Sequence, residues 1–354
     1  MDPGQRWTLD TTSLITHNIN LMNLKDIFTK KSEIWTYAPL TPDQIPDEPK
    51  TVEDIPMNKG YLNITVRSMH ITDVRKFTST YYGVVHSVVK LNHQGGKDAV
   101  FQNVTSPSEL KKLDGKHLDR VIVKNIPIVS LVPYRGEEVS LELGLFSVKQ
   151  SDLAAPFIDL LETMASTAGV SVLSAAVPFV EPLKKGIDGI IGTDADSALE
   201  IGIATTFNPP KTGWFVVMRT PKQSNIIPTL EVTPSDYVLV DKNSKEPLKD
   251  YPYVIYSIAY SRERNDWFKL PYLMDSYQAI QKAIQDGKDT DAEDSLKVFK
   301  RYAITSPDIL REDAIRICKL VEEELKSVLS FTLETKSIAP GKQLRDLESY
   351  PLYQ

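Results

Sequence analysis

The chain has 354 residues, of which 41% are hydrophobic and 25% are charged, a balance typical of globular rather than disordered proteins. Its formal net charge of −6 argues against a protein that binds nucleic acid through a general excess of lysine and arginine. The single cysteine, Cys318, cannot form a disulfide within the chain, and no secretory signal begins it, so we expect a cytoplasmic protein.

Residues 1–59 are predicted to form an N-terminal arm and a proline-rich linker. The run APLTPDQIPDEPKTVEDIP places five prolines among acidic residues, and proline fixes φ and removes an amide donor. Large apolar residues precede this run, among them Trp7 and Trp35. These side chains argue against a free tail, so we expect the arm to dock on its own domain or on a protein partner.

A β-rich unit is predicted over residues 60–260. In YLNITVRSM and EVSLELGLFSVK, apolar residues alternate with polar ones, the pattern of half-buried strands. NHQGGKD is typical of a hairpin turn, because paired glycines tolerate positive φ. Many short strands with long connections favour an antiparallel β-sandwich over a parallel sheet.

A helical insertion is predicted at about residues 151–192. Residues 163–180 carry no charge, but their small and hydroxyl side chains give little driving force to cross a membrane. Two interpretations remain: a helical hairpin packed on the sandwich, or an element released to insert into a partner or a membrane. The candidate insertion residues are Val170, Val172, Leu173, Val177, Phe179, Ile190 and Ile191.

After residue 260 the periodicity becomes helical, and residues 261–335 are predicted to form a helical subdomain. Three helices are expected, over 271–287, 292–304 and 306–331, with Ser306 as the N-cap of the third. Residues 336–354 are expected to form a tail, in which Tyr350 and Tyr353 could anchor in a groove.

No complete catalytic or metal-binding motif stands in the sequence, so no catalytic residue, metal or cofactor is predicted. The five histidines lack the spacing that places two imidazoles on one helix face. The segment YSRERNDWFKLPY interleaves basic and aromatic residues, which indicates either a connection to the helices or a binding surface. The candidate protein-binding residues are Trp7, Trp35, Arg262, Arg264, Trp267, Phe268, Tyr350 and Tyr353.

The predicted fold is α+β, mainly β, with an antiparallel sandwich, a helical insertion and a C-terminal helical subdomain. In architecture alone it resembles C2-like and other sandwich modules, which implies no function. We expect a non-enzymatic interaction or adaptor protein that binds a protein partner or itself and does not bind nucleic acid. The alternatives are a membrane-active or toxic effector that deploys residues 157–192, and a hydrolase with a dispersed site.

Overall fold

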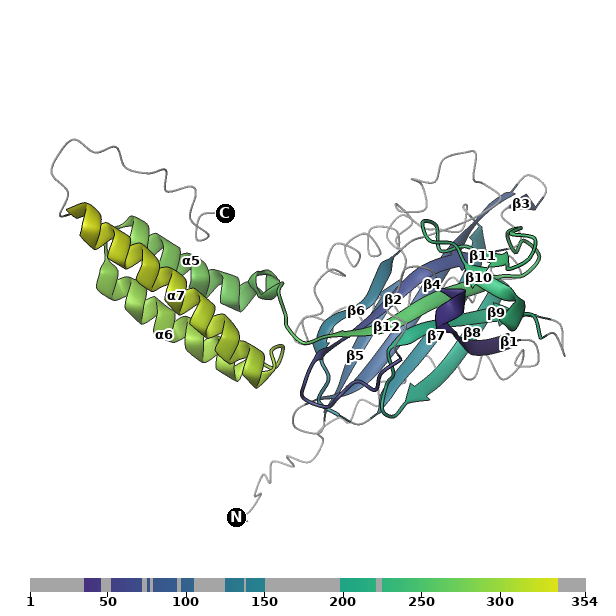
Figure 1. The fold of residues 1–354 in the computed structure, drawn as a ribbon, viewed down its shortest axis with the longest axis horizontal. Coiled ribbons are helices and arrows are strands. Elements are labelled where there is room, and N and C mark those ends of the chain that lie inside the picture. The colour runs from purple at the N-terminus through teal and green to yellow at the C-terminus, as the bar shows by residue number, and fades with distance from the viewer. Residues whose placement is uncertain are drawn as a thin grey trace, which may run out of the picture.

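The computed structural model describes residues 35–45, 52–71, 75–76, 79–93, 97–104, 125–136, 138–149, 198–220 and 225–336. Antiparallel sheets form one end of the molecule, and three helices form the other (Figure 1). The predicted α+β class, with strands first and helices last, is therefore confirmed. The predicted insertion at 151–192 and most of the tail, including Tyr350 and Tyr353, lie outside the described residues.

The first sheet has five strands, and each neighbouring pair is antiparallel. Their order across the sheet is β1 (Trp35–Leu40), β9 (Gly213–Arg219), β12 (Tyr253–Ser261), β2 (Tyr61–His70) and β6 (Ile126–Pro133). The predicted alternation is visible in β2, where Leu62, Ile64 and Val66 are fully buried while the residues between them are half-buried.

The second sheet also contains five strands. They are β3 (Arg75–Lys76), β4 (Ser79–His93), β7 (Val139–Lys149) and β8 (Ala198–Phe207) in that order, with β5 (Lys97–Val104) also paired to β4. A smaller hairpin pairs β10 (Leu230–Val232) with β11 (Leu239–Asp241). Strands β4 and β5 pair His93 with Lys97, so they form the hairpin that the glycine pair predicted.

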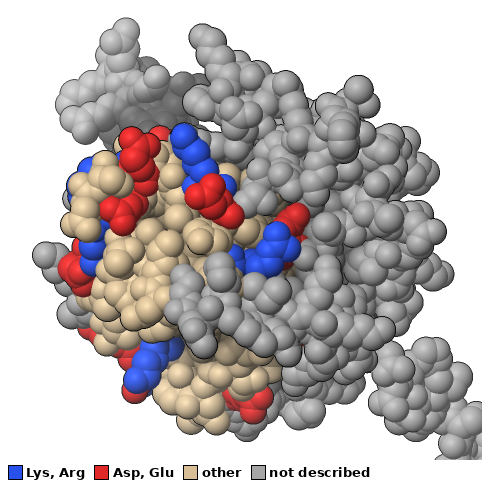
Figure 2. Space-filling view, turned by 90° about the vertical axis from the view of Figure 1, so that its right-hand side faces the viewer, with Lys and Arg blue, Asp and Glu red and all other residues tan. Residues whose placement is uncertain are grey.

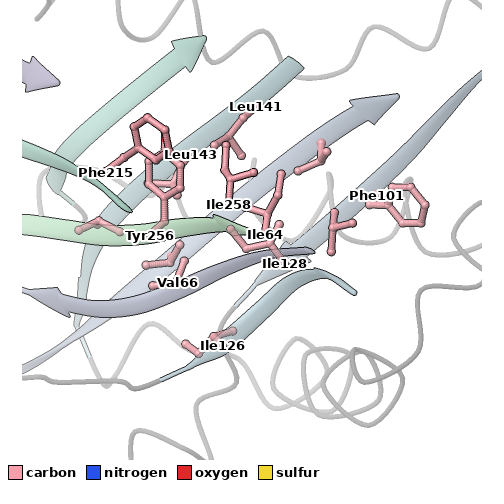
Figure 3. Packing of buried hydrophobic residues seen from close by; sticks show 14 of the residues in the cluster. Ile64, Val66, Phe101, Ile126, Ile128, Leu141, Leu143, Phe215, Tyr256 and Ile258 are labelled. Carbon is pink, nitrogen blue, oxygen red and sulfur yellow. The ribbon is translucent and has the colours of Figure 1, made fainter. Parts of the chain in front are cut away.

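The main apolar core takes side chains from both five-stranded sheets. Figure 3 shows Ile64 and Val66 of β2 near Leu141 and Leu143 of β7, with Phe215 of β9 in the same cluster. Strand β9 also buries its opposite face, because Trp214, Val216 and Met218 pack in a second cluster with the β10–β11 hairpin. A strand covered on both faces needs an uninterrupted apolar run, which explains the sequence WFVVM.

Part of the predicted N-terminal arm belongs to the β body. Residues 35–40 form edge strand β1, where Pro39 is tolerated because an edge strand can lack an amide donor. The buried Gln44 side chain donates to the carbonyls of Ile227 and Leu230, at 2.8 and 2.7 Å. Farther along, the Ile55 amide donates to the Pro210 carbonyl. The body therefore begins well before residue 60.

The helical part contains α5 (Pro271–Gln285), α6 (Asp289–Thr305) and α7 (Arg311–Lys336). Helix α6 begins three residues earlier than predicted, with Asp289 and Asp291 in its first turn, where carboxylates stabilise the helix N-terminus. Helix α7 begins at Arg311, not at the predicted Ser306. The Ser306 hydroxyl instead accepts a hydrogen bond from the Asp308 amide, and residues 306–310 connect α6 to α7.

The helices enclose their own apolar core, which is separate from the main core of the β body. Phe299 of α6 is fully buried, and its ring meets that of Trp267 edge-on at 5.5 Å between centroids. Ala314, Ile317 and Val321 of α7 line the same core, as the predicted apolar stripe requires. Among the helices that the structure describes, none is both long and apolar enough to span a bilayer.

We predict that Phe299→Ala lowers the free energy of unfolding of the helical part by about 3–5 kcal/mol, because it leaves a cavity in a packed core. Val298→Ala is the matched control, since Val298 is adjacent on α6 but 43% exposed. It should change the free energy by less than about 0.5 kcal/mol. Urea unfolding followed by circular dichroism at 222 nm, the helix band, measures both. Equal effects of the two variants would contradict the described burial.

Candidate functional site

The helices meet the β body through a junction built from two connections. Residues 262–270 lead from β12 into α5, and residues 306–310 lead from α6 into α7 (Figure 1). The predicted binding segment 260–272 is therefore the link between the two parts of the molecule. Buried polar groups, rather than a shared apolar core, hold these connections against the strands.

Asp313, in the first turn of α7, accepts hydrogen bonds from three elements. Its Oδ2 accepts from the Tyr61 hydroxyl at 2.7 Å and from the Arg264 amide at 2.8 Å, and its Oδ1 accepts from Arg316 Nε at 2.7 Å. The Tyr61 hydroxyl in turn accepts from the Leu310 amide at 2.9 Å. Asp313 is only 5% exposed, and a buried carboxylate needs this number of donors to offset its lost hydration.

Arg264 is fully buried and joins three segments. Its Nε donates to Asp266 at 3.0 Å, and its Nη1 donates to the carbonyls of Leu131 and Asp308, at 3.1 and 3.0 Å. Leu131 has a φ of +51°, which L residues rarely adopt. Its amide donates to Asn63 while its carbonyl accepts from Arg264, so hydrogen bonds on both sides hold this conformation.

A second arginine reinforces the junction. Arg135 Nη2 donates to the carbonyls of Pro307 and Ile309, at 3.0 and 3.4 Å, and burial lowers the pKa of its guanidinium. The Tyr272 hydroxyl hydrogen-bonds to the Asp308 carboxylate at 3.1 Å. The connection at 306–310 is thus held from the β body by Arg135 and from α5 by Tyr272.

A cleft of about 440 Å³ opens beside this junction. The β body contributes Lys59 and Tyr260 to its lining, the connection contributes Arg262, and α7 contributes Glu312 and Arg316. Lys59 pairs with Glu312 at 2.9 Å across the two parts of the molecule. The cleft therefore exists only while the helices keep this position on the body.

A smaller groove of about 220 Å³ lies next to the cleft, and Tyr260 lines both. Its apolar walls include Leu40, Ile45 and Trp214, and Arg67 of β2 also lines it. The Arg67 guanidinium carbon lies 4.9 Å from the centre of the Trp214 ring. Arg67 is thus a half-exposed cation set among apolar walls.

The candidate residues at 262–268 occupy different environments. Arg262 is exposed and lines the cleft, while Phe268 is 49% exposed. Arg264 is buried in the junction, where it cannot contact a partner, and Trp267 packs against Phe299 and Tyr277 in the helical core. Arg262 and Phe268 are therefore the two candidates of this group whose side chains are exposed.

The structure does not describe the side chains of the remaining candidate residues. Trp35 lies in β1, but its side chain is not among those described. The others fall outside the described residues: Trp7, Val170, Val172, Leu173, Val177, Phe179, Ile190, Ile191, Tyr350 and Tyr353.

Three important residues escaped prediction, because nothing in the local sequence distinguishes them. Tyr61 and Arg67 belong to an ordinary alternating strand, and Asp313 resembles any acid in the first turn of a helix. Their roles arise from partners up to 252 residues away, as in the bond from Tyr61 to Asp313. Sequence periodicity reports which face a residue occupies and not which distant group it meets.

Cys318 and His70 are two further residues whose side chains could take part in chemistry, and both are buried. Cys318 lies in the helical core, and burial raises the pKa of its thiol, which keeps the thiol protonated near neutral pH. His70 is buried, with its Nε2 3.2 Å from the Lys249 carbonyl. Within the described part of the chain, no three histidine, cysteine or acidic residues are grouped so as to hold a metal ion.

Searches of protein-family models, curated proteins and solved structures found no match to the chain.

The junction predicts a pH dependence of stability. Burial, and then the neighbouring Asp313 carboxylate, raise the pKa of Tyr61 above its ordinary value of 10.0. The folded chain therefore retains this proton at pH values where the unfolded chain releases it. The contribution of Tyr61 is fully present below about pH 10 and is lost as the pH rises above that value.

We predict that Tyr61→Phe lowers the free energy of unfolding by about 1–3 kcal/mol at pH 8, because Asp313 and the Leu310 amide each lose a partner. The difference from the unmodified chain should shrink at pH 11. Urea unfolding at the two pH values measures this, with Tyr302→Phe, at an exposed position, as the control. A difference that stays the same at both pH values would contradict the prediction.

Proposed function

We propose that this chain is a non-enzymatic interaction protein, acting as an adaptor in a protein complex, and that the junction cleft receives a protein partner. The observation that carries this proposal is the composite lining of the cleft, with Lys59 and Tyr260 from the body and Glu312 and Arg316 from α7. The buried hydrogen bonds of Arg264 hold the two parts in one orientation, so the surface is formed before a partner arrives.

The chemistry of the cleft and of the connection at 262–270 suits a protein surface. Arginine and tyrosine are the residue types that most often dominate the energy of protein interfaces, and both line this cleft. Arg262 forms no ion pair with any described residue, whereas Lys59 and Arg316 have acidic partners. Phe268 adds an exposed aromatic ring on the same connection. Arg262 and Phe268 are therefore the proposed contact residues.

We propose that the two five-stranded sheets pack face to face as a sandwich, because side chains from both enter one core. A cytoplasmic location is likewise proposed, supported by the lone cysteine and its buried, protonated thiol. The effector alternative depends on residues 157–192, which lie outside the described part of the chain.

The opposite end of the molecule provides a comparison surface. Figure 2 shows that end, where acidic and basic side chains lie near one another around uncharged residues. In the turn that follows β11, Lys242 pairs with Asp43 at 2.9 Å and Lys245 pairs with Glu231 at 2.6 Å. These cations are already neutralised by partners, so Lys245 is a suitable control for Arg262.

Site-specific photocrosslinking in cells that make the protein tests the proposal. A photoreactive phenylalanine derivative replaces Phe268 in one variant and Tyr302, exposed on α6, in a control. We expect a discrete crosslinked protein at position 268 and none at position 302. Arg262→Glu should reduce that product at least tenfold, because it reverses the charge offered to the partner, whereas Lys245→Glu should leave it unchanged.

Two results would overturn this function. One is the absence of any product at position 268. The other is a product that Arg262→Glu and Lys245→Glu reduce equally, which would point to general charge effects rather than to the cleft. Thermal unfolding of each variant must first show that its midpoint is unchanged.

A further inference from the structure

The groove beside the cleft contains a cation that is held in place without an acidic partner. Arg67 Nε donates to the Ser257 hydroxyl at 2.8 Å, and its Nη1 donates to the Asn125 side chain at 2.9 Å. Its guanidinium carbon lies 4.9 Å from the centre of the Trp214 ring and 5.9 Å from that of Tyr237. Two hydrogen bonds and two aromatic rings therefore fix the plane of the guanidinium.

The charge of Arg67 is not neutralised within the described part of the chain. By comparison, Arg219 pairs with Glu200 at 2.9 Å, and Arg264 pairs with Asp266 at 3.0 Å. No described acid lies within ion-pair distance of Arg67, and its Nη2 makes no hydrogen bond to a described residue. Because neutral groups hold Nε and Nη1, the guanidinium keeps its charge and has Nη2 available for a ligand.

The groove around this cation is mainly apolar. Leu40, Ile45 and Trp214 form its wall, and Val52 lies at its margin with 57% of its surface exposed. A ligand that complements this arrangement needs a carboxylate to meet Arg67 and apolar groups beside it. Desolvation by the apolar wall strengthens such a charge-assisted hydrogen bond.

The position of the groove connects it to the proposed partner. Tyr260 lines both the groove and the cleft, so the two hollows adjoin at the end of β12 and one extended chain can occupy both. The groove volume of about 220 Å³ has room for a few side chains and not for a folded domain. Glu53 also lines the groove, and its carboxylate repels an anion there.

We propose that this groove binds an extended segment of the protein partner in which an aspartate or glutamate lies between apolar residues, and that Arg67 binds its carboxylate. This inference rests on the proposed function, because it assigns the chemistry that the adaptor recognises in its partner. Arg67 determines specificity for the acid, and the apolar wall selects its neighbours.

A peptide array tests this inference with the full-length chain. The probes are N-acetylated, C-amidated heptapeptides with Asp or Glu at the central position and combinations of Leu, Val and Phe around it. Each has a twin with Asn or Gln at the centre. We expect the chain to retain a subset of acidic peptides at least tenfold better than their amide twins.

The variants separate Arg67 from general electrostatics. Arg67→Gln should abolish the preference for the acid, and Arg67→Lys should weaken it, because lysine loses the fork held by Ser257 and Asn125. Glu53→Gln should strengthen retention two- to fivefold by removing a like charge. Lys211→Gln, near the groove but paired with Asp54, should leave it unchanged.

The outcomes distinguish this inference from the proposed function. Equal retention of acidic and amide peptides by the unmodified chain overturns the inference, as does a preference that survives Arg67→Gln. A preference that disappears in Arg262→Glu but not in Arg67→Gln assigns the acid to the cleft; it overturns the groove and leaves the adaptor function intact. If position 268 gives no crosslink while Arg67 still selects acids, the cleft fails and the groove stands as a peptide site.

Discussion

The arrangement of the molecule depends on one buried carboxylate. Asp313 accepts hydrogen bonds from the Tyr61 hydroxyl of β2, from the Arg264 amide in the connection to α5, and from Arg316 in its own helix. The three donors come from β2, from the connection at 262–270 and from α7, so this carboxylate holds the start of α7 against both the strand and the connection. Without it, the O–H donor of Tyr61 and the N–H donor of Arg264 would be buried without these partners, which costs more free energy than the bonds contribute.

This polar junction joins two parts that each have an apolar core. The strands of both five-stranded sheets contribute to one cluster, and the helices bury another around Phe299. Apolar contact is not directional, so an apolar interface would tolerate sliding. Hydrogen bonds to the backbone at Leu131, Pro307 and Asp308 have strict geometry, and they define a single orientation of the helices on the body.

Strand β12 connects this junction to the surface features. It runs through the middle of the first sheet, between β9 and β2, and it ends where the connection to the helices begins. Ser257, near its middle, holds Arg67, and Tyr260, near its end, lines the groove and the cleft. One strand thus supplies both the residue that holds the Arg67 cation and a residue that lines the groove and the cleft.

The sequence by itself determined that the strands come first and the helices last. Two-residue alternation in YLNITVRSM and helical periodicity after residue 270 reflect which side chains leave water, and that information is local. It also indicated that segment 260–272 could connect the strands to the helices. The sequence predicted that α7 begins at Ser306, because serine is a favoured N-cap residue. In the structure α7 begins at Arg311, and the backbone groups of residues 306–310 instead hydrogen-bond to Tyr61 and to the arginines of the junction.

Only the tertiary structure decided what the polar residues do. Whether an arginine is buried like Arg264, stacked like Arg67 or exposed like Arg262 depends on groups far away in the chain. Arg264 and Arg262 are two residues apart and have the same chemistry, so no local pattern separates them. Burial and pairing are properties of the assembled fold, and they decide which charge supports the structure and which remains free to bind.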